Sequence, residues 1–240
     1  MRKKIIAMIP ARIGSTRLPR KNLALLDGKP LIYYAISAAK ESGVFDRILL
    51  NSDSHIFKDV AERYGVEFYH RPEDLGSSKA KSDSVVYDFM KKHAGDILVW
   101  VNPTSPLQPS SEISDVIDYF IENNLDSLIT VKNENVHCLL DGQPINFDSG
   151  ELFAQTQDLK PVQPFVYSLM MWRYAPFMKA FEEKGYALLN GKIGFYSVSN
   201  LASVIIKTAE DLKFAEYVLT GRNNIGDYEI KYDPIIKGEK

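Results

Sequence analysis

Short apolar runs alternate with amphipathic stretches over the first half of the chain. The runs have the length and composition of buried strands, which they predict at 4–9, 48–50, 66–69, 97–101 and 128–131. Apolar residues at helical spacing lie between them and predict helices near 32–39, 54–64, 84–92 and 113–121. Strands that alternate with helices need crossover connections, so we expect an α/β fold whose mainly parallel sheet carries helices on both faces.

The pattern degrades between about 133 and 176, where Asp141-Gly142-Gln143-Pro144 marks a turn. We expect an inserted arm in this stretch, with one more strand at 166–172. Regular structure returns after the arm, and the predicted elements are a helix at 177–184, a strand at 193–198 and a helix at 208–219. The chain is therefore expected to form a single domain over 1–220, followed by a polar C-terminal tail at 221–240.

Composition and charge exclude several classes of protein. The 240 residues carry 29 Lys and Arg against 31 Asp and Glu, so no global basic field would recruit nucleic acid or an anionic membrane. No apolar run reaches the roughly 20 residues that a bilayer span needs. The single cysteine, Cys138, excludes an intramolecular disulfide. The apolar run after the basic N-terminus is cut short by Pro10 and is interpreted as a strand rather than a signal peptide, so a cytoplasmic location is expected.

The loop after the first predicted strand concentrates positive charge. Ten residues hold four cations: Arg12, Arg17, Arg20 and Lys21. Ligands bind at the carboxyl ends of strands in open α/β sheets, and Gly14 and Ser15 could turn backbone amides toward an anion there. Local charge on a chain with little net charge favours a small polyanion such as a triphosphate. The plain alternative is a solvated basic loop.

The same loop resembles the nucleotide-binding loop of the CMP-sugar synthetase (acylneuraminate cytidylyltransferase) family. The resemblance rests on IPARIGSTRLPRKN at 9–22 and GKPLI at 28–32. Further matching segments are Asn51-Ser52-Asp53-Ser54, Arg71-Pro72, Asn102-Pro103-Thr104-Ser105-Pro106-Leu107, Gln157-Asp158-Leu159 and Thr208-Ala209-Glu210-Asp211-Leu212. The resemblance covers roughly residues 4–220.

The resemblance implies a Rossmann-like fold, a dimerisation arm, and Mg²⁺-dependent transfer of CMP from CTP to a small acidic acceptor, a sugar acid. The resemblance implies Arg12 and Lys21 as catalytic residues, and Lys207, which departs from the family pattern, is the third catalytic candidate. The implied nucleotide-binding set is Ala11, Arg12, Gly14, Ser15, Arg17, Lys21, Asn22, Arg71 and Ser82, of which Asn22, Arg71 and Ser82 would face the cytosine. The implied acceptor-binding residues are Asn102, Thr104, Gln157 and Tyr196. A homodimer is expected, without nucleic-acid or membrane partners.

The metal site departs from the family pattern. Ile205 and Lys207 occupy the positions where the family has two metal-binding aspartates. Neither side chain offers the hard oxygen that Mg²⁺ needs, so the metal ligands are left unassigned and Mg²⁺ itself is in doubt. In one interpretation, the Lys207 ammonium replaces part of the metal's charge, or the nucleotide and another acid hold the ion. In the other, Ile205 completes a buried strand, Lys207 faces solvent, and the ordinary chemistry is lost.

The acceptor side departs as well. Asn102 replaces a family glutamine, Gln108 replaces an arginine, and Gln155 and Thr156 replace basic residues of the arm. Fewer cations are left to pair with a sugar carboxylate, so we expect an altered acceptor. The rival functions are a nucleotide-binding homologue without turnover and a sugar-1-phosphate nucleotidyltransferase.

Several other residues have simpler expected roles. Asp53 follows a predicted strand and is expected to cap the next helix. Trp100 lies in the most apolar strand and is expected in the core. Trp172, with Met170 and Met171, is expected to serve an interface of the arm.

Overall fold

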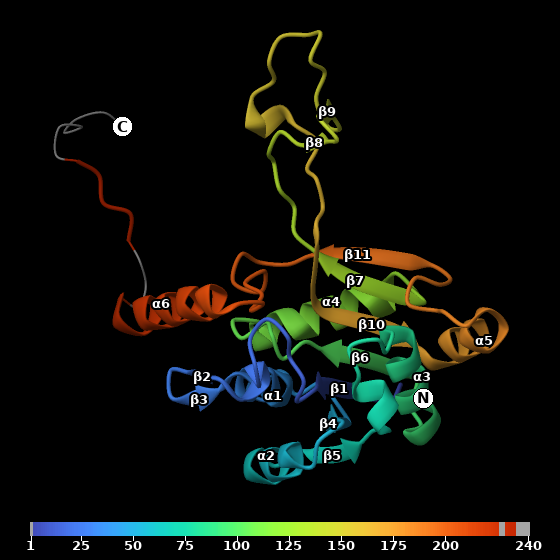
Figure 1. Ribbon diagram of the computed structural model, residues 1–240. Helices are drawn as coiled ribbons and strands as arrows, with labels where there is room; N and C mark the ends of the chain where they lie inside the picture. The colour runs from blue at the N-terminus through green and yellow to red at the C-terminus, as the bar shows by residue number, and fades with distance from the viewer. Residues whose placement is uncertain (1, 226–228, 234–240) are drawn as a thin grey trace.

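A seven-stranded sheet forms the centre of the molecule, in a computed structural model that describes residues 2–225 and 229–233. Its strand order is β11-β7-β10-β6-β1-β4-β5 (Figure 1). The strands are β1 (Ile5–Ala11), β4 (Arg47–Ser52), β5 (Glu67–His70), β6 (Ile97–Val101), β7 (Ser127–Val131), β10 (Phe165–Arg173) and β11 (Ile193–Ser197). β10 is antiparallel to both of its neighbours, and the remaining pairs are parallel. The expected mainly parallel sheet is confirmed.

Helices cover both faces of this sheet (Figure 1). They are α1 (Leu31–Ser42), α2 (Ile56–Tyr64), α3 (Ser82–Lys92), α4 (Ser110–Glu122), α5 (Tyr174–Lys184) and α6 (Ala209–Ile225). α1, α2 and α4 pack with Ala7 and Ile9 of β1, whereas α3 and α5 pack with Ile6 and Met8 of the same strand. This alternation follows from the two-residue period of a strand and gives the sheet a core on each side. None of the described helices is long and apolar enough to cross a membrane.

Short elements complete the chain between these helices and strands. They are the 3-10 helices η1 (Lys21–Leu23), η2 (Glu73–Gly76) and η3 (Thr156–Asp158), and the two-residue strands β2 (Leu25–Leu26), β3 (Lys29–Pro30), β8 (Leu139–Leu140) and β9 (Gln143–Pro144). α6 packs beside β2, where Leu26, Ile206 and Leu219 share a small apolar cluster. This contact holds the start of α6 near the loop that follows β1.

An arm projects from the sheet between β7 and β10 (Figure 1). It spans 132–164 and is narrower than the expected 133–176, because Phe165–Arg173 is a strand of the central sheet. Its two sides are joined near the sheet by a bridge between Glu134 and Val162. The arm role expected for Met170, Met171 and Trp172 is wrong, because all three are buried in β10, within the core.

The C-terminal segment is partly helical. α6 runs on to Ile225, past the predicted end at 219, so the first residues of the expected tail at 221–240 belong to this helix. The rest of that expectation falls largely on residues 226–228 and 234–240, which lie outside the described residues.

Candidate active site

A cavity of about 370 Å³ opens where β1 and β6 end. Its wall is built from the last residues of β1, the loop that leads to η1, the segment between η2 and α3, and the turn after β6. Of the predicted site residues, the cavity brings together Ala11, Arg12, Ser15, Arg17, Lys21, Asn22, Arg71, Ser82, Asn102 and Thr104. Segments that are far apart in sequence therefore meet at the carboxyl edge of the parallel strands, as expected for this architecture.

Lys21 is held at the edge of the cavity by the C-terminal part of the chain. Its Nζ donates a hydrogen bond to the carbonyl oxygen of Ile206 at 2.9 Å. Burial lowers the pKa of Lys21 below its ordinary value, and the nearby charges of Arg17 and Arg12 lower it further, against an opposing effect of Asp211. A partly desolvated ammonium that two neighbouring cations repel forms a site that an anion would stabilise.

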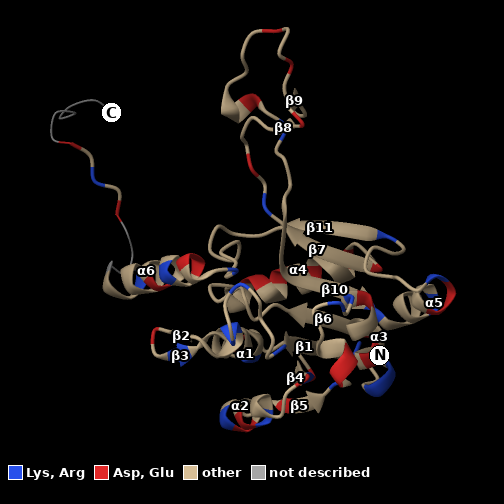
Figure 2. Cartoon of the chain, viewed as in Figure 1, with Lys and Arg blue, Asp and Glu red and all other residues tan. Residues whose placement is uncertain are grey.

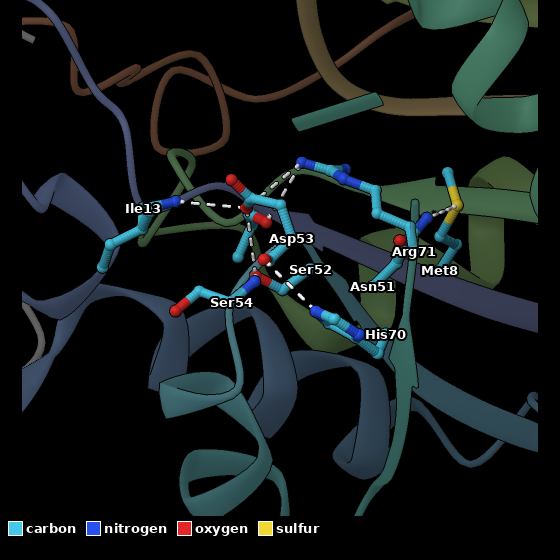
Figure 3. Close-up of polar contacts among 9 residues, drawn as sticks. Met8, Ile13, Asn51, Ser52, Asp53, Ser54, His70 and Arg71 are labelled. Atoms are coloured by element: carbon cyan, nitrogen blue, oxygen red, sulfur yellow. Dashed lines mark hydrogen bonds and ion pairs between the residues drawn. The ribbon is translucent and has the colours of Figure 1, made fainter. Parts of the chain in front are cut away.

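Arg71, which lines the cavity, forms an ion pair with Asp53. Asp53 follows β4 and Arg71 follows β5, and Nη2 of the arginine lies 3.7 Å from Oδ1 of the aspartate (Figure 3). Asp53 Oδ1 also accepts a hydrogen bond from the N–H of Ile13, at 3.3 Å. The expected helix-capping role of Asp53 is wrong: His55 occupies the N-cap of α2, without a side-chain cap, and the carboxylate instead binds Arg71 and the cationic loop.

Two polar atoms of cavity-lining residues are buried without a partner among the described residues. They are Oδ1 of Asn22 and Nε of Arg71. Asn22 is 6% exposed and Arg71 is 4% exposed. A buried donor or acceptor that lacks a partner costs about 1–3 kcal/mol, so a ligand that supplies both partners would recover that free energy. The pair offers one acceptor and one donor, which suits the edge of a heterocyclic base.

The charge of the cavity is local. Arg12, Arg17, Lys21 and Arg71 line it, and its lining holds no Asp or Glu from the described part of the chain. Elsewhere acidic and basic residues are interspersed, as on α2, α5 and α6 (Figure 2). The cavity is therefore a site for a compact anion rather than for an extended one.

The residues near the expected metal position do not fit Mg²⁺. Ile205 is half-buried in a small apolar cluster with Val166 and Val198, and it lies outside the strands, not in the buried strand of one interpretation. Lys207 is exposed, as that interpretation expects. Across 2–225 and 229–233, no group of three or more His, Cys, Asp and Glu side chains could hold a metal ion. A hydrocarbon and an ammonium supply no ligand for a hard divalent cation.

Asp211 lies four residues after Lys207, and its carboxylate caps the start of α6. Its Oδ2 accepts hydrogen bonds from the backbone N–H groups of Lys207 and Thr208, at 2.8 Å each, and from the Thr208 hydroxyl at 3.0 Å. Burial raises the pKa of Asp211, but these donors together outweigh burial and lower it. The carboxylate is committed to ordering the start of the helix.

The predicted acceptor residues divide into two pairs. Asn102 and Thr104 line the cavity, and Oδ1 of Asn102 accepts hydrogen bonds from the backbone N–H and the hydroxyl of Thr104. Gln157 lies exposed in η3 on the arm, and Tyr196 of β11 packs edge-on against Tyr119, so neither lines the cavity. The position of Tyr196 does not support its expected contact with an acceptor.

Three other predicted residues contribute less directly than expected. Gly14 and Lys207 are absent from the described lining of the cavity. The backbone N–H of Ser15 donates to the carbonyl oxygen of Ile13 at 3.1 Å, so it is not free to bind an anion in this conformation.

Some residues of the wall were missed by sequence reasoning. Trp100 is half-buried and lines the cavity, so its expected place in the core is only partly correct. Its position near the carboxyl end of a central strand was the available signal. Leu75 of η2 and Ser77 and Ser78, which follow it, also line the cavity and belong to no recognised motif.

Asn102 also fixes a strained residue near the cavity. Its Nδ2 donates to the carbonyl oxygen of Tyr167 at 3.0 Å. Tyr167 has φ = 58°, in the left-handed region that tyrosine rarely adopts, and the pairing of β10 with β7 is irregular over the same stretch. Such a conformation costs on the order of 1–2 kcal/mol and re-aims the side chain at the start of β10.

Comparison with known proteins agrees with this geometry. A family model described as cytidylyltransferase matches residues 6–159. An N-acylneuraminate cytidylyltransferase of Streptococcus agalactiae serotype V is 31% identical over 168 residues, covering 66% of this chain and 41% of that protein. A pseudaminic acid cytidylyltransferase of Campylobacter jejuni is 35% identical over 126 residues, covering 50% of this chain and 54% of that protein. The chain thus spans about half the length of these relatives, or less.

Solved structures show the same fold. A CMP:2-keto-3-deoxy-manno-octonic acid synthetase complexed with CTP matches with a TM-score of 0.71 at 14% identity, over 91% of this chain and 99% of that chain. A 4-diphosphocytidyl-2C-methyl-D-erythritol synthase of Anaerococcus prevotii matches with a TM-score of 0.65 at 15% identity, over the same shares of the two chains. The Rossmann-like arrangement of sheet and helices is therefore shared with both.

Proposed function

Because the chain belongs to the cytidylyltransferase family, we propose that it binds CTP in the cavity beside β1 and transfers CMP to a sugar acid or related acceptor. An acceptor hydroxyl attacks the α-phosphorus and loses its proton. A new bond forms between that oxygen and the α-phosphorus, while the bond from the α-phosphorus to the bridging oxygen breaks and pyrophosphate leaves. Such a displacement needs positioning and charge neutralisation more than covalent chemistry by the protein.

The observation that carries this proposal is that two cavity-lining residues, Asn22 and Arg71, each have a buried polar atom without a partner among the described residues. Asn22 Oδ1 would accept from the exocyclic amine of cytosine, and Arg71 Nε would donate to an acceptor on the same base. Uracil lacks that amine and would leave the Asn22 acceptor unsatisfied. Discrimination by an unpaired buried group of this kind is strong.

The cations at the open side suit the phosphates. Arg12, Arg17 and Lys21 would contact the triphosphate and neutralise the charge that develops on the leaving pyrophosphate. The acceptor would lie toward Asn102 and Thr104, on the wall formed by the turn after β6. The few cations on this wall support an acceptor that differs from the usual nine-carbon sugar acid.

Calorimetric titration with the four ribonucleoside triphosphates tests the nucleotide assignment. We expect CTP to bind at least about tenfold more tightly than UTP, a difference of about 1.4 kcal/mol in binding free energy. Asn22→Ala should remove most of that preference, because it removes the acceptor for the cytosine amine. Asn123→Ala, an exposed amide on the far end of α4, is the matched control. Equal affinity for CTP and UTP would contradict the assignment.

Pyrophosphate release in the presence of CTP and a panel of sugar acids tests the reaction. Release with one acceptor supports transfer, whereas CTP binding without release favours a homologue without turnover, the rival that Ile205 and Lys207 support. Preference for another triphosphate would favour a sugar-1-phosphate nucleotidyltransferase. Rapid turnover of N-acetylneuraminate would contradict the altered acceptor. A cytoplasmic location belongs to this proposal, because the cellular supply of CTP lies there.

A homodimer formed through the arm is also part of the proposal. The arm carries large exposed apolar side chains at Leu139, Leu140, Ile145, Leu152 and Phe153, of which Leu152 is 95% exposed. Apolar surface of this kind marks an interaction site. Sedimentation equilibrium should show a dimer for the full chain and a monomer for Leu139→Asp combined with Leu140→Asp. A monomeric unmodified chain would contradict the proposal.

A further inference from the structure

We propose that Lys207, with the cations of the cavity, takes the place of a divalent metal ion, so that this chain binds the nucleotide triphosphate without Mg²⁺. The inference rests on the proposed function, since it assigns a role at the phosphate end of the same cavity. It is supported by the position of the segment 205–207, by the absence of acids from the described cavity lining, and by the balance of charge.

Two hydrogen bonds place the backbone of this segment at the cavity. The N–H of Ile206 donates to the carbonyl oxygen of Thr104 at 2.8 Å, and the carbonyl oxygen of Ile206 accepts from Lys21 Nζ at 2.9 Å. Thr104 and Lys21 both line the cavity. Lys207 therefore follows directly after Ile206, whose backbone is held by residues from two walls of the cavity.

The side chains of this segment divide between packing and solvent. Ile206 is fully buried beside α6, which anchors the segment, whereas Lys207 is exposed and free to turn toward a ligand. Its charge already acts on Lys21, whose pKa is lowered by burial first and by Arg17, Arg12 and Lys207 as well. The hydrogen bond between Lys21 Nζ and the carbonyl oxygen of Ile206 places the two lysines on adjoining segments beside the cavity.

Two acids of this region, Asp53 and Asp211, are committed to other partners. Asp53 is paired with Arg71 and accepts from the N–H of Ile13. Asp211 accepts three hydrogen bonds through Oδ2 at the start of α6 and lies beside Lys207. A divalent cation placed between Lys21 and Lys207 would meet two positive charges and no free pair of carboxylates, which is the reverse of a magnesium site.

Charge balance favours the metal-free nucleotide. A nucleoside triphosphate without bound metal carries roughly four negative charges near neutral pH. Arg12, Arg17, Lys21 and Lys207 offer a matching number of cations. Mg²⁺ would cancel half of the charge on the ligand and weaken its attraction to these side chains.

Calorimetric titration of the full chain with CTP, in excess EDTA and again in excess Mg²⁺, tests this inference. We expect binding in EDTA to be at least as tight as in Mg²⁺. Lys207→Met should weaken binding in EDTA by about tenfold. Lys213→Met, which removes an exposed lysine that contacts Tyr217 on α6, should leave it unchanged. Circular dichroism confirms that each variant is folded.

The outcomes separate this inference from the proposed function. CTP binding that needs Mg²⁺, or equal affinities of Lys207→Met and the unmodified chain, overturns the inference and leaves the nucleotide assignment intact. Failure to bind CTP in either medium overturns the proposed function, and the inference with it. As a direct readout of metal, Ile205→Asp combined with Lys207→Asp should bind Mn²⁺ by electron paramagnetic resonance, whereas the unmodified chain should not. Stoichiometric Mn²⁺ binding by the unmodified chain also overturns the inference.

Discussion

Asp53 pairs with Arg71, which lines the cavity, and this pairing links three segments of the chain. The arginine donates to the carbonyl oxygen of Ala11 at 3.3 Å, and the aspartate holds the N–H of Ile13. The two side chains are 11% and 5% exposed, so each would be a buried unpaired charge without the other. This pair fixes the start of the cationic loop relative to the neighbouring strands.

Removing the aspartate charge should loosen that loop. Asp53→Asn is expected to lower the free energy of unfolding by about 2 kcal/mol, because Arg71 would lose its partner in a desolvated place. CTP should also bind more weakly, since the loop carries the cations that we propose to contact the phosphates. Urea unfolding and calorimetry measure the two effects. Asp59→Asn, on the exposed side of α2, is the control, and equal stability of the two variants would refute the prediction.

Lys21 should make nucleotide binding sensitive to alkaline pH. Its pKa is lowered, first by burial, so it loses its proton at a lower pH than an ordinary lysine and the affinity for CTP falls earlier as pH rises. In the free protein the unfolded chain binds this proton more tightly, so the residue's contribution to stability rises over the same range. Dissociation constants for CTP, measured from neutral pH to about pH 10, should rise less for Lys21→Arg, which stays charged, than for the unmodified chain. Parallel pH profiles for the two proteins would show that Lys21 does not titrate there.

The cavity-lining residues were predictable from the sequence where they lie within a single motif. Arg12, Arg17 and Lys21 lie within a single loop, so their convergence needed little tertiary information. The role of Asp53 was not predictable, because an acid after a strand satisfies helix capping and ion pairing equally well. Trp100 was also open, since a residue near the end of a central strand can face either the core or the ligand cavity.

The loop between β5 and α3 is the element that closes the cavity opposite the cationic loop. Within it, η2 approaches the end of β4 so closely that a Cβ on Gly76 would lie on the carboxylate side chain of Asp53. Glycine is required there by space, and its backbone is not in the left-handed region. The same loop supplies Leu75, Ser77 and Ser78 to the cavity wall.

Adding one methyl group at this approach should displace the loop. Gly76→Ala is expected to lower the free energy of unfolding by about 1–3 kcal/mol. The new methyl group would clash with Asp53, whose side chain is held in place by Arg71 and by the N–H of Ile13. It should also weaken CTP binding by moving the wall. Gly221→Ala, in the exposed part of α6 with nothing near its Cβ, should be neutral or slightly stabilising. Thermal unfolding that ranks the two variants equally would contradict this account.

At the level of elements, the strands and helices followed from periodicity, but the direction of β10 did not. Its apolar run predicts a strand, and a run of this kind is the same in either direction. Its place between β6 and β7 depends on long-range pairing, which no local pattern records. The predicted boundary of the arm is wrong for the same reason, because no local pattern separates β10 from the arm residues that precede it.

At the scale of the whole molecule, the described residues form an α/β body and an arm that leaves the sheet between β7 and β10 (Figure 1). The arm has a small aromatic cluster of its own, in which the His137 ring stacks on Phe153 at 4.2 Å and meets Phe147 at 4.9 Å. Near the sheet it is tied by Lys132 N–H to the carbonyl oxygen of Pro164 and by Asn133 N–H to the Ser197 hydroxyl. The nucleotide cavity is lined without any arm residue from the described ranges.

The body should therefore fold and bind nucleotide without the arm. Replacing 136–160 by a short Gly-Ser linker keeps the bridge between Glu134 and Val162 and is expected to change CTP affinity by less than about twofold. The same variant should be a monomer by sedimentation. Near-UV circular dichroism checks the packing of the body. Loss of CTP binding by a folded variant would show that the arm supports the cavity.

The reversed strand has a consequence for how such a chain can change over evolution. Because β10 returns beside β7, both ends of the arm meet at one edge, and the number of residues between them does not set the register of any strand. Lengthening a flexible connection costs only about 0.6 kcal/mol for each doubling, so insertions there are cheap. A lineage could thus remodel its contacts with other subunits by insertion or deletion while the machinery for recognising the base stays as it is.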